Sequence, residues 1–217
     1  MKYKAIFFDW DGTLVDSTGR IVDSMQRASQ YVGMPALSDY AIRQIIGLGL
    51  PEALKTLWPT IGDEQLSLMS AEYSANFSHH SDVEVGFYAH ARELLAELRR
   101  LGYKLAVATG KTRKGLDEML DGMQVRDLFH ASRCADETSS KPSPHMLEEL
   151  LHELNIKSSE ALMVGDTSFD LEMALAIDMD SIGMSHGAHD DEILLKYKPR
   201  ALCHSLQDLL NWIKANG

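Results

Sequence analysis

Short apolar runs and segments of helical period alternate along most of this chain of 217 residues. Residues 5–8 are all apolar and are followed at once by an aspartate, which predicts a buried strand that ends at residue 8. Similar runs recur in the second half of the chain, between segments whose apolar residues lie three or four positions apart. We expect further strands at 104–109, 129–132, 161–164 and 181–184, and helices at 91–101, 112–122, 144–154 and 169–177.

This alternation of strands and helices predicts an α/β fold built on one parallel sheet. Consecutive parallel strands need a crossover helix between them, and these helices then cover both faces of the sheet. Ligand sites in such sheets lie beyond the carboxyl ends of the strands. The residues that directly follow each predicted strand are therefore the first candidates for function.

Residues 17–86 interrupt the alternation with helical patterns and little strand signal. Four helices are expected here. The first and the fourth each show an apolar stripe, formed by Ile21, Met25, Ala28 and Val32 in the first and by Leu66, Met69, Tyr73 and Phe77 in the fourth. The second is capped by Ser38 and carries Ile42, Ile45 and Ile46, and the third has Pro51 at its first position. We expect a small helical bundle inserted after the first strand, with residues 1–16 and 87–217 forming the sheet domain. Residues 18–19 and 81–86 are the expected hinges.

The composition narrows the possible partners. The chain has 21 lysines and arginines against 32 aspartates and glutamates, a formal charge of −11. This charge repels nucleic acid and anionic membranes, so small metabolites are better candidate ligands than polymers. No apolar run approaches the roughly 18 residues needed to span a bilayer.

Two further features bear on the compartment. Residues 1–4 lead straight into the first strand instead of a signal peptide. The only cysteines, Cys134 and Cys203, form no C-x-x-C pair and suit packing in a reducing compartment. We expect a cytoplasmic protein, a monomer or homodimer, without redox chemistry.

The most informative residues follow the first strand. Asp9 and Asp11 are two positions apart, so both carboxylates point the same way if the extended backbone continues past the strand, and Gly12 then permits a sharp turn. Two like charges about 4 Å apart repel by roughly 4 kcal/mol at an effective dielectric constant near 20. Such a pair requires a cation, a proton or a strong donor nearby.

Three later segments supply further polar groups at predicted strand ends. They are Thr109-Gly110, where glycine allows backbone N–H groups to approach an anion, Lys141-Pro142, and the segment Gly165-Asp166-Thr167-Ser168-Phe169-Asp170. Asp9, Asp11, Asp166 and Asp170 would then share one crevice with one lysine. Oxygen ligands without clustered histidine or cysteine favour a hard cation, and Mg²⁺ binds through a few carboxylates, waters and substrate phosphate oxygens.

This set of residues predicts phosphoryl transfer. Asp9 attacks phosphorus and becomes an aspartyl-phosphate, while Asp11 donates a proton to the departing alkoxide and then deprotonates the hydrolytic water. Asp166 holds the metal, with Asp170 supporting it directly or through water. Thr109, Gly110 and Lys141 bind the phosphate oxygens, and the metal and Lys141 offset the charge of the dianion.

These segments together resemble the four motifs of the haloacid dehalogenase-like superfamily. The matching residues are Asp9-x-Asp11-Gly12-Thr13-Leu14-Val15-Asp16-Ser17, Thr109-Gly110, Lys141-Pro142 and Gly165-Asp166-Thr167-x-x-Asp170. Within that superfamily the chain is similar to phosphoglycolate phosphatase-like members, which carry an α-helical cap between the first and second motifs.

The resemblance implies a Rossmann-like core, Mg²⁺ as cofactor and the first aspartate of the first motif, here Asp9, as nucleophile. It also implies that the backbone carbonyl of Asp11 joins the metal ligands, and that residues 17–86 form the cap. An acid at position 11 argues against the dehalogenase branch. Many relatives have asparagine where this chain has Gly110, and substrate identity in the family depends mostly on the cap.

Each candidate also has a plainer interpretation. Asp170 fits the first turn of a helix, where the helix dipole favours an acid, and Thr109 fits a hydroxyl that bonds its own turn. His79-His80, His186 and His189 lack the company of further soft ligands and are not expected to bind metal. Arg43 fits either a substrate contact or a solvated helix. The cluster of Lys111, Arg113 and Lys114 fits either an anion site or a charged helix start.

The predicted function is a Mg²⁺-dependent phosphatase acting on a small phosphorylated metabolite such as phosphoglycolate. A phosphomutase of the β-phosphoglucomutase type would use the same nucleophile and is the first alternative. A non-enzymatic phospho-switch similar to a response-regulator receiver is the second, although such modules lack a sizeable cap. The inserted helices favour catalysis with control of water.

Overall fold

The computed structural model describes residues 2–217, and its centre is the predicted parallel sheet. The six strands lie in the order β5-β4-β1-β6-β7-β8, and all neighbours run parallel. Their bounds are β1 Ala5–Phe8, β4 Lys104–Thr109, β5 Ala131–Cys134, β6 Ala161–Gly165, β7 Asp180–Met184 and β8 Ala201–Cys203. The expected α/β class with a Rossmann-like sheet is confirmed, and β1 lies between β4 and β6, the strands that precede the second and fourth motifs.

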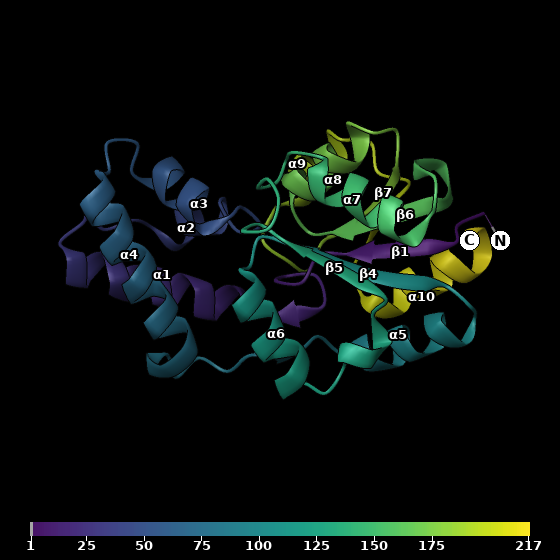
Figure 1. The fold of residues 1–217 in the computed structure, drawn as a ribbon, viewed down its shortest axis with the longest axis horizontal. Coiled ribbons are helices and arrows are strands. Elements are labelled where there is room, and N and C mark those ends of the chain that lie inside the picture. The colour runs from purple at the N-terminus through teal and green to yellow at the C-terminus, as the bar shows by residue number, and fades with distance from the viewer. Residues whose placement is uncertain (1) are drawn as a thin grey trace.

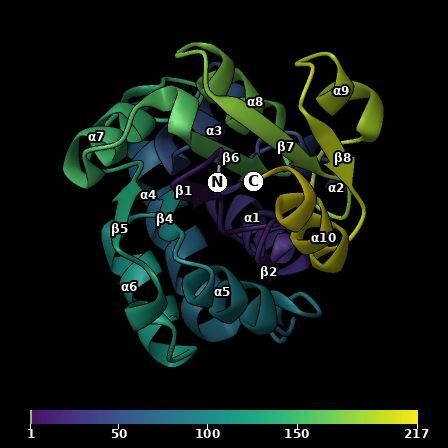
Figure 2. The same ribbon diagram turned by 90° about the vertical axis from the view of Figure 1, so that its right-hand side faces the viewer.

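Helices cover both faces of this sheet (Figure 2). One face carries α5 (Ala91–Arg100), α6 (Arg113–Gly122) and α10 (Leu206–Asn216), and the other carries α7 (His145–Leu154) and α8 (Ser168–Leu175), with α9 (Asp191–Leu195) near the β8 edge. Strand residues alternate between the two cores, with Phe8 packing under α5 and Phe7 under α7. Each fully buried side chain of this size contributes about 1.5–3 kcal/mol to folding.

The helical insertion forms a second body beside the carboxyl ends of the strands (Figure 1). It contains α1 (Thr18–Val32), α2 (Asp39–Arg43), α3 (Leu50–Leu57) and α4 (Asp63–Ala75), which continues as a π-helix from Asn76 to His80. The hydroxyl of Ser38 accepts a hydrogen bond from the N–H of Ala41, as expected of a helix cap. Buried Met25, Leu54 and Met69 give this body its own apolar core.

The chain passes between the two bodies through a short antiparallel pair. β2 (Val15–Asp16) pairs with β3 (Gly86–Phe87), so the segment that leaves the sheet lies beside the segment that returns. Both termini lie at the opposite end of the molecule, where Figure 1 marks N and C side by side. The insertion lies at the edge of the sheet body where the strands end, away from the C-terminus.

Several elements differ from the expectation. β5 begins two residues later than predicted, because Phe129 lies in the preceding loop with its ring 6.0 Å from Trp10, after a short 3-10 turn at Arg126–Leu128. α3 begins at Leu50, so Pro51 occupies its second position. β2, β3, β8, α9, α10 and the 3-10 turn Ser158–Glu160 were not predicted.

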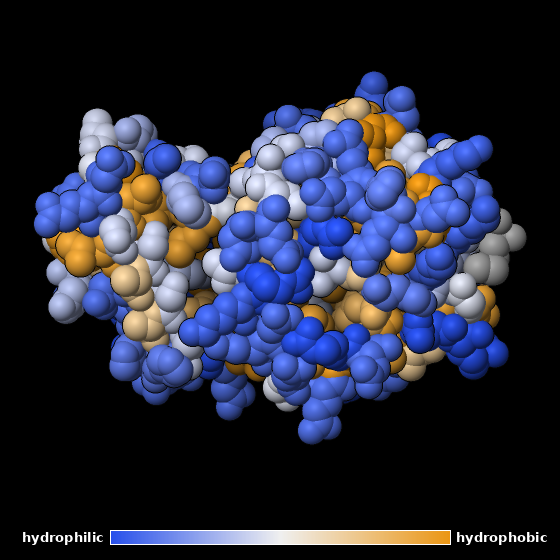
Figure 3. Space-filling model, in the orientation of Figure 1, coloured by the Kyte–Doolittle hydropathy of each residue, from blue (hydrophilic) through white to orange (hydrophobic). Residues whose placement is uncertain are grey.

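Hydrophilic residues cover most of the face seen in Figure 3, and hydrophobic side chains show between them on the helical body. Two exposed tyrosines on that body, Tyr31 and Tyr40, are 73% and 60% accessible. Among the helices of residues 2–217, none combines the length and the apolar character needed to cross a membrane.

Candidate functional site

The three central strands bring the predicted motifs together. β1 lies between β4 and β6, and all three run in the same direction, so the residues that follow them meet at one edge. Asp9 follows β1 directly, and its N–H donates to the carbonyl of Val164 in β6 at 2.9 Å. Asp166 follows β6 in the same way. The expected crevice lies at this edge.

Three of the four predicted aspartates form a compact cluster. Asp9, Asp166 and Asp170 each offer a carboxylate oxygen, and these oxygens all lie within 4.8 Å of one another. The three residues are at most 1% exposed. Asp9 Oδ2 is buried and accepts no hydrogen bond from the described residues. An uncompensated buried carboxylate oxygen is costly, and several such oxygens facing one point fit a hard divalent cation.

Lys141 lies against this cluster. Its Nζ is 2.5 Å from Asp9 Oδ1 and 2.6 Å from Asp170 Oδ1, and its side chain is fully buried. Burial lowers the pKa of the ammonium, but the carboxylates of Asp170 and Asp9 outweigh that effect and raise the pKa above its usual value. Lys141 is therefore charged, and one positive charge faces three carboxylates. The residual negative charge favours a cation.

Two of these carboxylates, those of Asp9 and Asp166, bind protons more strongly than usual. Burial raises the pKa of Asp9 well above its ordinary value, and the nearby Asp170 and Asp166 carboxylates add to the effect against the opposing charge of Lys141. Burial, followed by the charge of Asp170, raises the pKa of Asp166 to about 7. A cation at the cluster would stabilise the charged forms and displace the protons.

Short hydrogen bonds fix two of the cluster carboxylates. The Thr13 hydroxyl donates to Asp166 Oδ1 at 2.7 Å, and the N–H of Ala188 donates to Oδ2 at 2.7 Å. Thr167 donates to Asp170 Oδ2 through its hydroxyl at 2.7 Å and its N–H at 3.1 Å. Asp170 thus lies in the first turn of α8, as its plainer interpretation held, and also in the cluster.

Close packing around Asp166 explains a glycine of the first motif. Gly12 has a φ of +85°, which side chains other than glycine rarely adopt, and an added Cβ there would lie 2.2 Å from an Asp166 carboxylate oxygen. The expected sharp turn is present. It also leaves the space that Asp166 occupies.

The Asp11 carboxylate lines the same cavity as Asp9 but lies outside the three-carboxylate cluster. Its Oδ1 accepts a hydrogen bond from the Ser17 hydroxyl at 2.6 Å and lies 3.1 Å from Lys111 Nζ. The backbone turns at residues 12–14, and Asp11 forms a bridge to Val15 across this turn. The Asp11 side chain is absent from the three-carboxylate cluster, so a metal role for Asp11 depends on its backbone carbonyl.

The second motif lies at the boundary with the helical body. Thr109 is fully buried, and its Oγ1 accepts from the N–H of Lys111 at 3.2 Å, the local turn bond that its plainer interpretation anticipated. Gly110 lines a cavity of about 590 Å³, to which Asp9 and Asp11 also contribute. An added Cβ at Gly110 would lie 2.5 Å from the carbonyl oxygens of Gly47 and Leu48.

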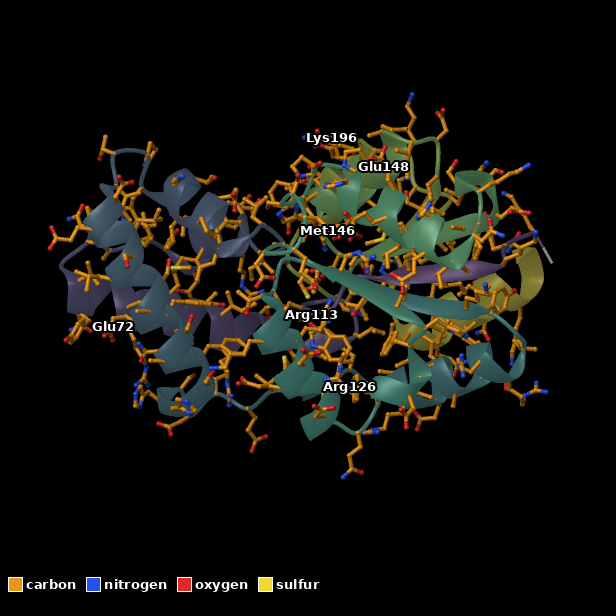
Figure 4. The ribbon with its side chains drawn as sticks, in the orientation of Figure 1. Glu72, Arg113, Arg126, Met146, Glu148 and Lys196 are labelled. Carbon is orange, nitrogen blue, oxygen red and sulfur yellow. The ribbon has the colours of Figure 1, made fainter. Side chains whose placement is uncertain are left out.

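The basic residues after Gly110 separate in space. Lys111 reaches Asp11 and lies 4.3 Å above the Phe77 ring of the helical body. Arg113 extends from the start of α6 toward β5 and donates to Glu137 and Ser132 (Figure 4). The interpretation as a charged helix start therefore fits Arg113, whereas Lys111 faces the cavity.

The remaining candidates, the histidines and Arg43, lie outside the carboxylate cluster. His186 Nε2 contacts the carbonyl of Thr13 at 3.0 Å, and His189 accepts at Nδ1 from the N–H of Ser168 at 3.0 Å. His79 and His80 are exposed, and Arg43 is not among the residues that line the cavity. The two cysteines are buried free thiols.

Sequence reasoning did not assign four residues that the structure brings to the site. They are Thr13, Ser17 and Thr167, each of which contacts a motif aspartate, and Lys111, which the sequence indicates only as part of a basic cluster and which contacts Asp11. Their positions inside or beside the motifs were the only available signal.

Comparisons with known proteins identify relatives in sequence and in fold. The sequence model described as "Haloacid dehalogenase-like hydrolase" matches residues 6–184. The phosphoglycolate phosphatase of Vibrio parahaemolyticus is 30% identical over 222 residues, covering 99% of this chain and 97% of the relative. Pyrophosphatase PpaX of Halalkalibacterium halodurans is 28% identical, covering 97% of both chains. A crystal structure of a predicted phosphoglycolate phosphatase from Haemophilus somnus is similar in fold, with a TM-score of 0.89, 22% identity and coverage of 98% and 99%.

Proposed function

Because the chain belongs to the haloacid dehalogenase-like hydrolase family, we propose that it is a phosphoric monoester hydrolase that uses Mg²⁺ to release phosphate from a small phosphorylated metabolite. The observation that carries the proposal is the buried cluster of Asp9, Asp166 and Asp170 beside Lys141. A phosphoryl group is anionic, and a carboxylate can approach it only where positive charge offsets both partners.

The donor set fits the proposed cofactor. Asp9, Asp166 and Asp170 would hold the cation through oxygen, the ligand type that Mg²⁺ prefers, and the backbone carbonyl of Asp11 is proposed as a further ligand. When bound, Mg²⁺ supplies positive charge that neutralises the phosphate oxygens and keeps the carboxylates ionised. Thr13, Ala188 and Thr167 orient Asp166 and Asp170 from outside the cluster.

Asp9 is the proposed nucleophile. Lys141 holds its Oδ1, whereas its Oδ2 has no hydrogen-bond partner among the described residues. Oδ2 forms a bond to phosphorus while the bond from phosphorus to the leaving oxygen breaks, which gives an aspartyl-phosphate. Lys141, the hydroxyl of Thr109 and the backbone at Gly110 are the proposed partners of the phosphate oxygens.

Asp11 is the proposed acid and base. It faces the same cavity as Asp9 and is free of the carboxylate cluster, so it can carry a proton without disturbing the cluster. It gives this proton to the leaving oxygen. It then takes a proton from the water that attacks phosphorus, which releases phosphate and restores the Asp9 carboxylate.

The helical body is the proposed cap. Residues 17–86 form it, and residues 1–16 and 87–217 form the catalytic core. The support is the position of the body over the strand ends and the contact of the Gly47 and Leu48 carbonyls with Gly110. A cap in this place limits entry of water to the aspartyl-phosphate and shapes the space for the leaving group.

Phosphoglycolate is the first compound to assay, because relatives carry that name. The phosphomutase alternative has less support, since a sugar phosphate needs many polar partners and the buried wall of the cavity is apolar. Conversion of β-glucose 1-phosphate to glucose 6-phosphate, without release of phosphate, would favour the mutase. Membership of a hydrolase family leaves the non-enzymatic switch without support.

The test is phosphate release with and without Mg²⁺. We expect release from phosphomonoesters in Mg²⁺, loss of release in EDTA, and recovery when Mg²⁺ is restored. Asp9→Asn should abolish turnover and keep the thermal melt close to that of the wild type. The matched control is Asp178→Asn, an exposed aspartate outside the site, which should keep full activity. Wild-type rates in Asp9→Asn, or undiminished turnover in EDTA, would reject the proposal.

A further inference from the structure

The cavity beside Asp9 is much larger than a phosphoryl group and a two-carbon acid require. Its volume is about 590 Å³, and it extends from Asp9 and Asp11 to the helical body. Sites of roughly 300–1,000 Å³ bury ligands of drug size. Phosphoglycolate bound at the carboxylates would therefore leave most of this space to water.

The buried wall of the cavity is apolar. On the side of the helical body it consists of Ile21, Met25, Ile45, Ile46 and Ala53, which are between 1% and 6% exposed. The half-buried rings of Tyr73 and Phe77 continue this wall. Such a surface favours aliphatic or aromatic groups, and apart from the Tyr73 hydroxyl it offers no partner to a carboxylate or to several hydroxyls.

Two cations near this wall are already engaged within the protein. Arg20 donates to the carbonyl of Val83 at 2.6 Å and to that of Phe77 at 3.3 Å. Lys111 lies 3.1 Å from Asp11. A carboxylate on the leaving group would have to compete for one of them.

The remaining polar lining residues lie at the mouth. Ser74, Ser78, His79, Thr112, Lys114 and Glu118 are all exposed, so they face solvent and not the deep part of the cavity. The polar character of the cavity thus increases outward from the apolar wall. A ligand with its phosphate at Asp9 meets this wall first.

We propose that the leaving group of the substrate is apolar: the enzyme acts on phosphate esters of aliphatic or aromatic alcohols larger than glycolate. This inference rests on the proposed phosphatase function and specifies its substrate class. The phosphate occupies the polar end beside Asp9 and Asp11, and the hydrocarbon part of the alcohol replaces water against the isoleucines and aromatic rings.

A homologous series of alkyl phosphates tests the inference. Ethyl, butyl and hexyl phosphate have leaving groups of similar basicity, so differences in kcat/KM report contacts with the hydrocarbon chain. We expect kcat/KM to rise about twofold to fourfold with each added methylene, the factor for transfer of a methylene from water to an apolar site. Phosphoglycolate should be a poorer substrate than hexyl phosphate.

A pair of matched variants links the effect to the cavity wall. Leu50 and Leu66 are both half-buried and pack against the same core of the helical body, but only Leu50 lines the cavity. Leu50→Gln should lower the ratio of kcat/KM for hexyl over ethyl phosphate by about fivefold. Leu66→Gln should leave this ratio unchanged.

The outcomes separate this inference from the proposed function. Phosphate release with no gain along the series, or with phosphoglycolate preferred over hexyl phosphate, would overturn the inference and keep the phosphatase. An equal loss of the ratio in both variants would also overturn it, because the effect would then not come from the wall. Release from none of the esters would reject the phosphatase and the inference together.

Discussion

Lys141 is the residue on which the electrostatics of the site depend most. Its ammonium lies between the carboxylates of Asp9 and Asp170, with no exposure to solvent. Removing one partner of a buried ion pair leaves a charge without compensation, which typically costs about 3–5 kcal/mol. The metal-free protein therefore depends on this side chain for stability.

We predict that Lys141→Met lowers the free energy of unfolding by about 3–5 kcal/mol in urea titrations with EDTA at pH 8, which lies above the pKa of about 7 of Asp166. The double variant Lys141→Met with Asp170→Asn should lose less than the sum of the two single changes, because it removes a charge from each side. Strictly additive losses would show that the lysine and the carboxylate are not coupled.

Sequence alone predicted the residues of the cluster better than their directions. The parallel sheet brings the carboxyl ends of its strands to one edge, independently of the loop conformations. The residues that follow these ends include Asp9, Asp166, Asp170 and Lys141. Asp11 reaches the same cavity but not the cluster, and the turn that its bridge to Val15 closes could not be predicted from the strand pattern. Lys111 could not be separated from its neighbours because its partner, Phe77, comes from the helical body.

At the level of elements, the loop between α2 and α3 is the part of the insertion that rests on the second motif. A Cβ atom added at residue 110 would lie 2.5 Å from the carbonyl oxygens of Gly47 and Leu48, which is too close for any side chain. Glycine at this position allows the loop to lie directly over the strand ends. The family's frequent asparagine would require a different spacing.

Gly110→Ala should therefore displace this loop and lower kcat/KM by about tenfold to a hundredfold, since a shift near 1 Å at a catalytic site has effects of this order. The melting temperature should change little, because each body keeps its own core. Gly62→Ala is the control, since an added Cβ there meets nothing within 4 Å. Unchanged kinetics in Gly110→Ala would show that the loop contact has no part in catalysis.

The elements that sequence analysis located well are those with strong apolar periodicity. α5 and β4 match their expected ranges because Leu94, Leu95 and Leu98 and the run at 105–108 are buried as the pattern indicates. β2 and β3 consist of two residues each and exist only because distant segments pair, so no local pattern indicates them. β5 shifted because the ring of Phe129 packs on Trp10 instead of joining the strand.

For the whole molecule, two bodies with separate cores meet at a site that contains more negative than positive charge. Burial and the Asp170 carboxylate raise the pKa of Asp166 to about 7, from a value of 3.8 in the absence of these effects. Between these two pH values the folded metal-free protein holds a proton that the unfolded chain has lost. This contribution to stability is complete below about pH 4 and disappears as the pH rises through 7.

Stabilisation of the folded protein by Mg²⁺ should increase as the pH rises, whereas the contribution of the Asp166 proton decreases. Protons compete with the metal for Asp166 below pH 7, and the raised pKa of Asp9 adds to this competition, so Mg²⁺ affinity should fall by about tenfold for each pH unit lost per competing proton. We predict that the difference in Tm between Mg²⁺ and EDTA, measured by differential scanning calorimetry, grows from pH 5 to pH 8. A difference independent of pH would contradict binding of the metal at these carboxylates.

The central claim, that Asp9 attacks phosphorus beside a caged cation, is tested most directly by mass spectrometry of the acid-quenched enzyme. Asp11→Asn should be unable to activate water, whereas p-nitrophenyl phosphate has a leaving group that needs no proton, so the aspartyl-phosphate should accumulate in this variant with Mg²⁺ present. The account predicts one phosphoryl group on the peptide that contains Asp9, and none in EDTA or in the variant that also carries Asp9→Asn. Phosphoryl transfer to another residue, or turnover without any phosphorylated enzyme, would contradict it.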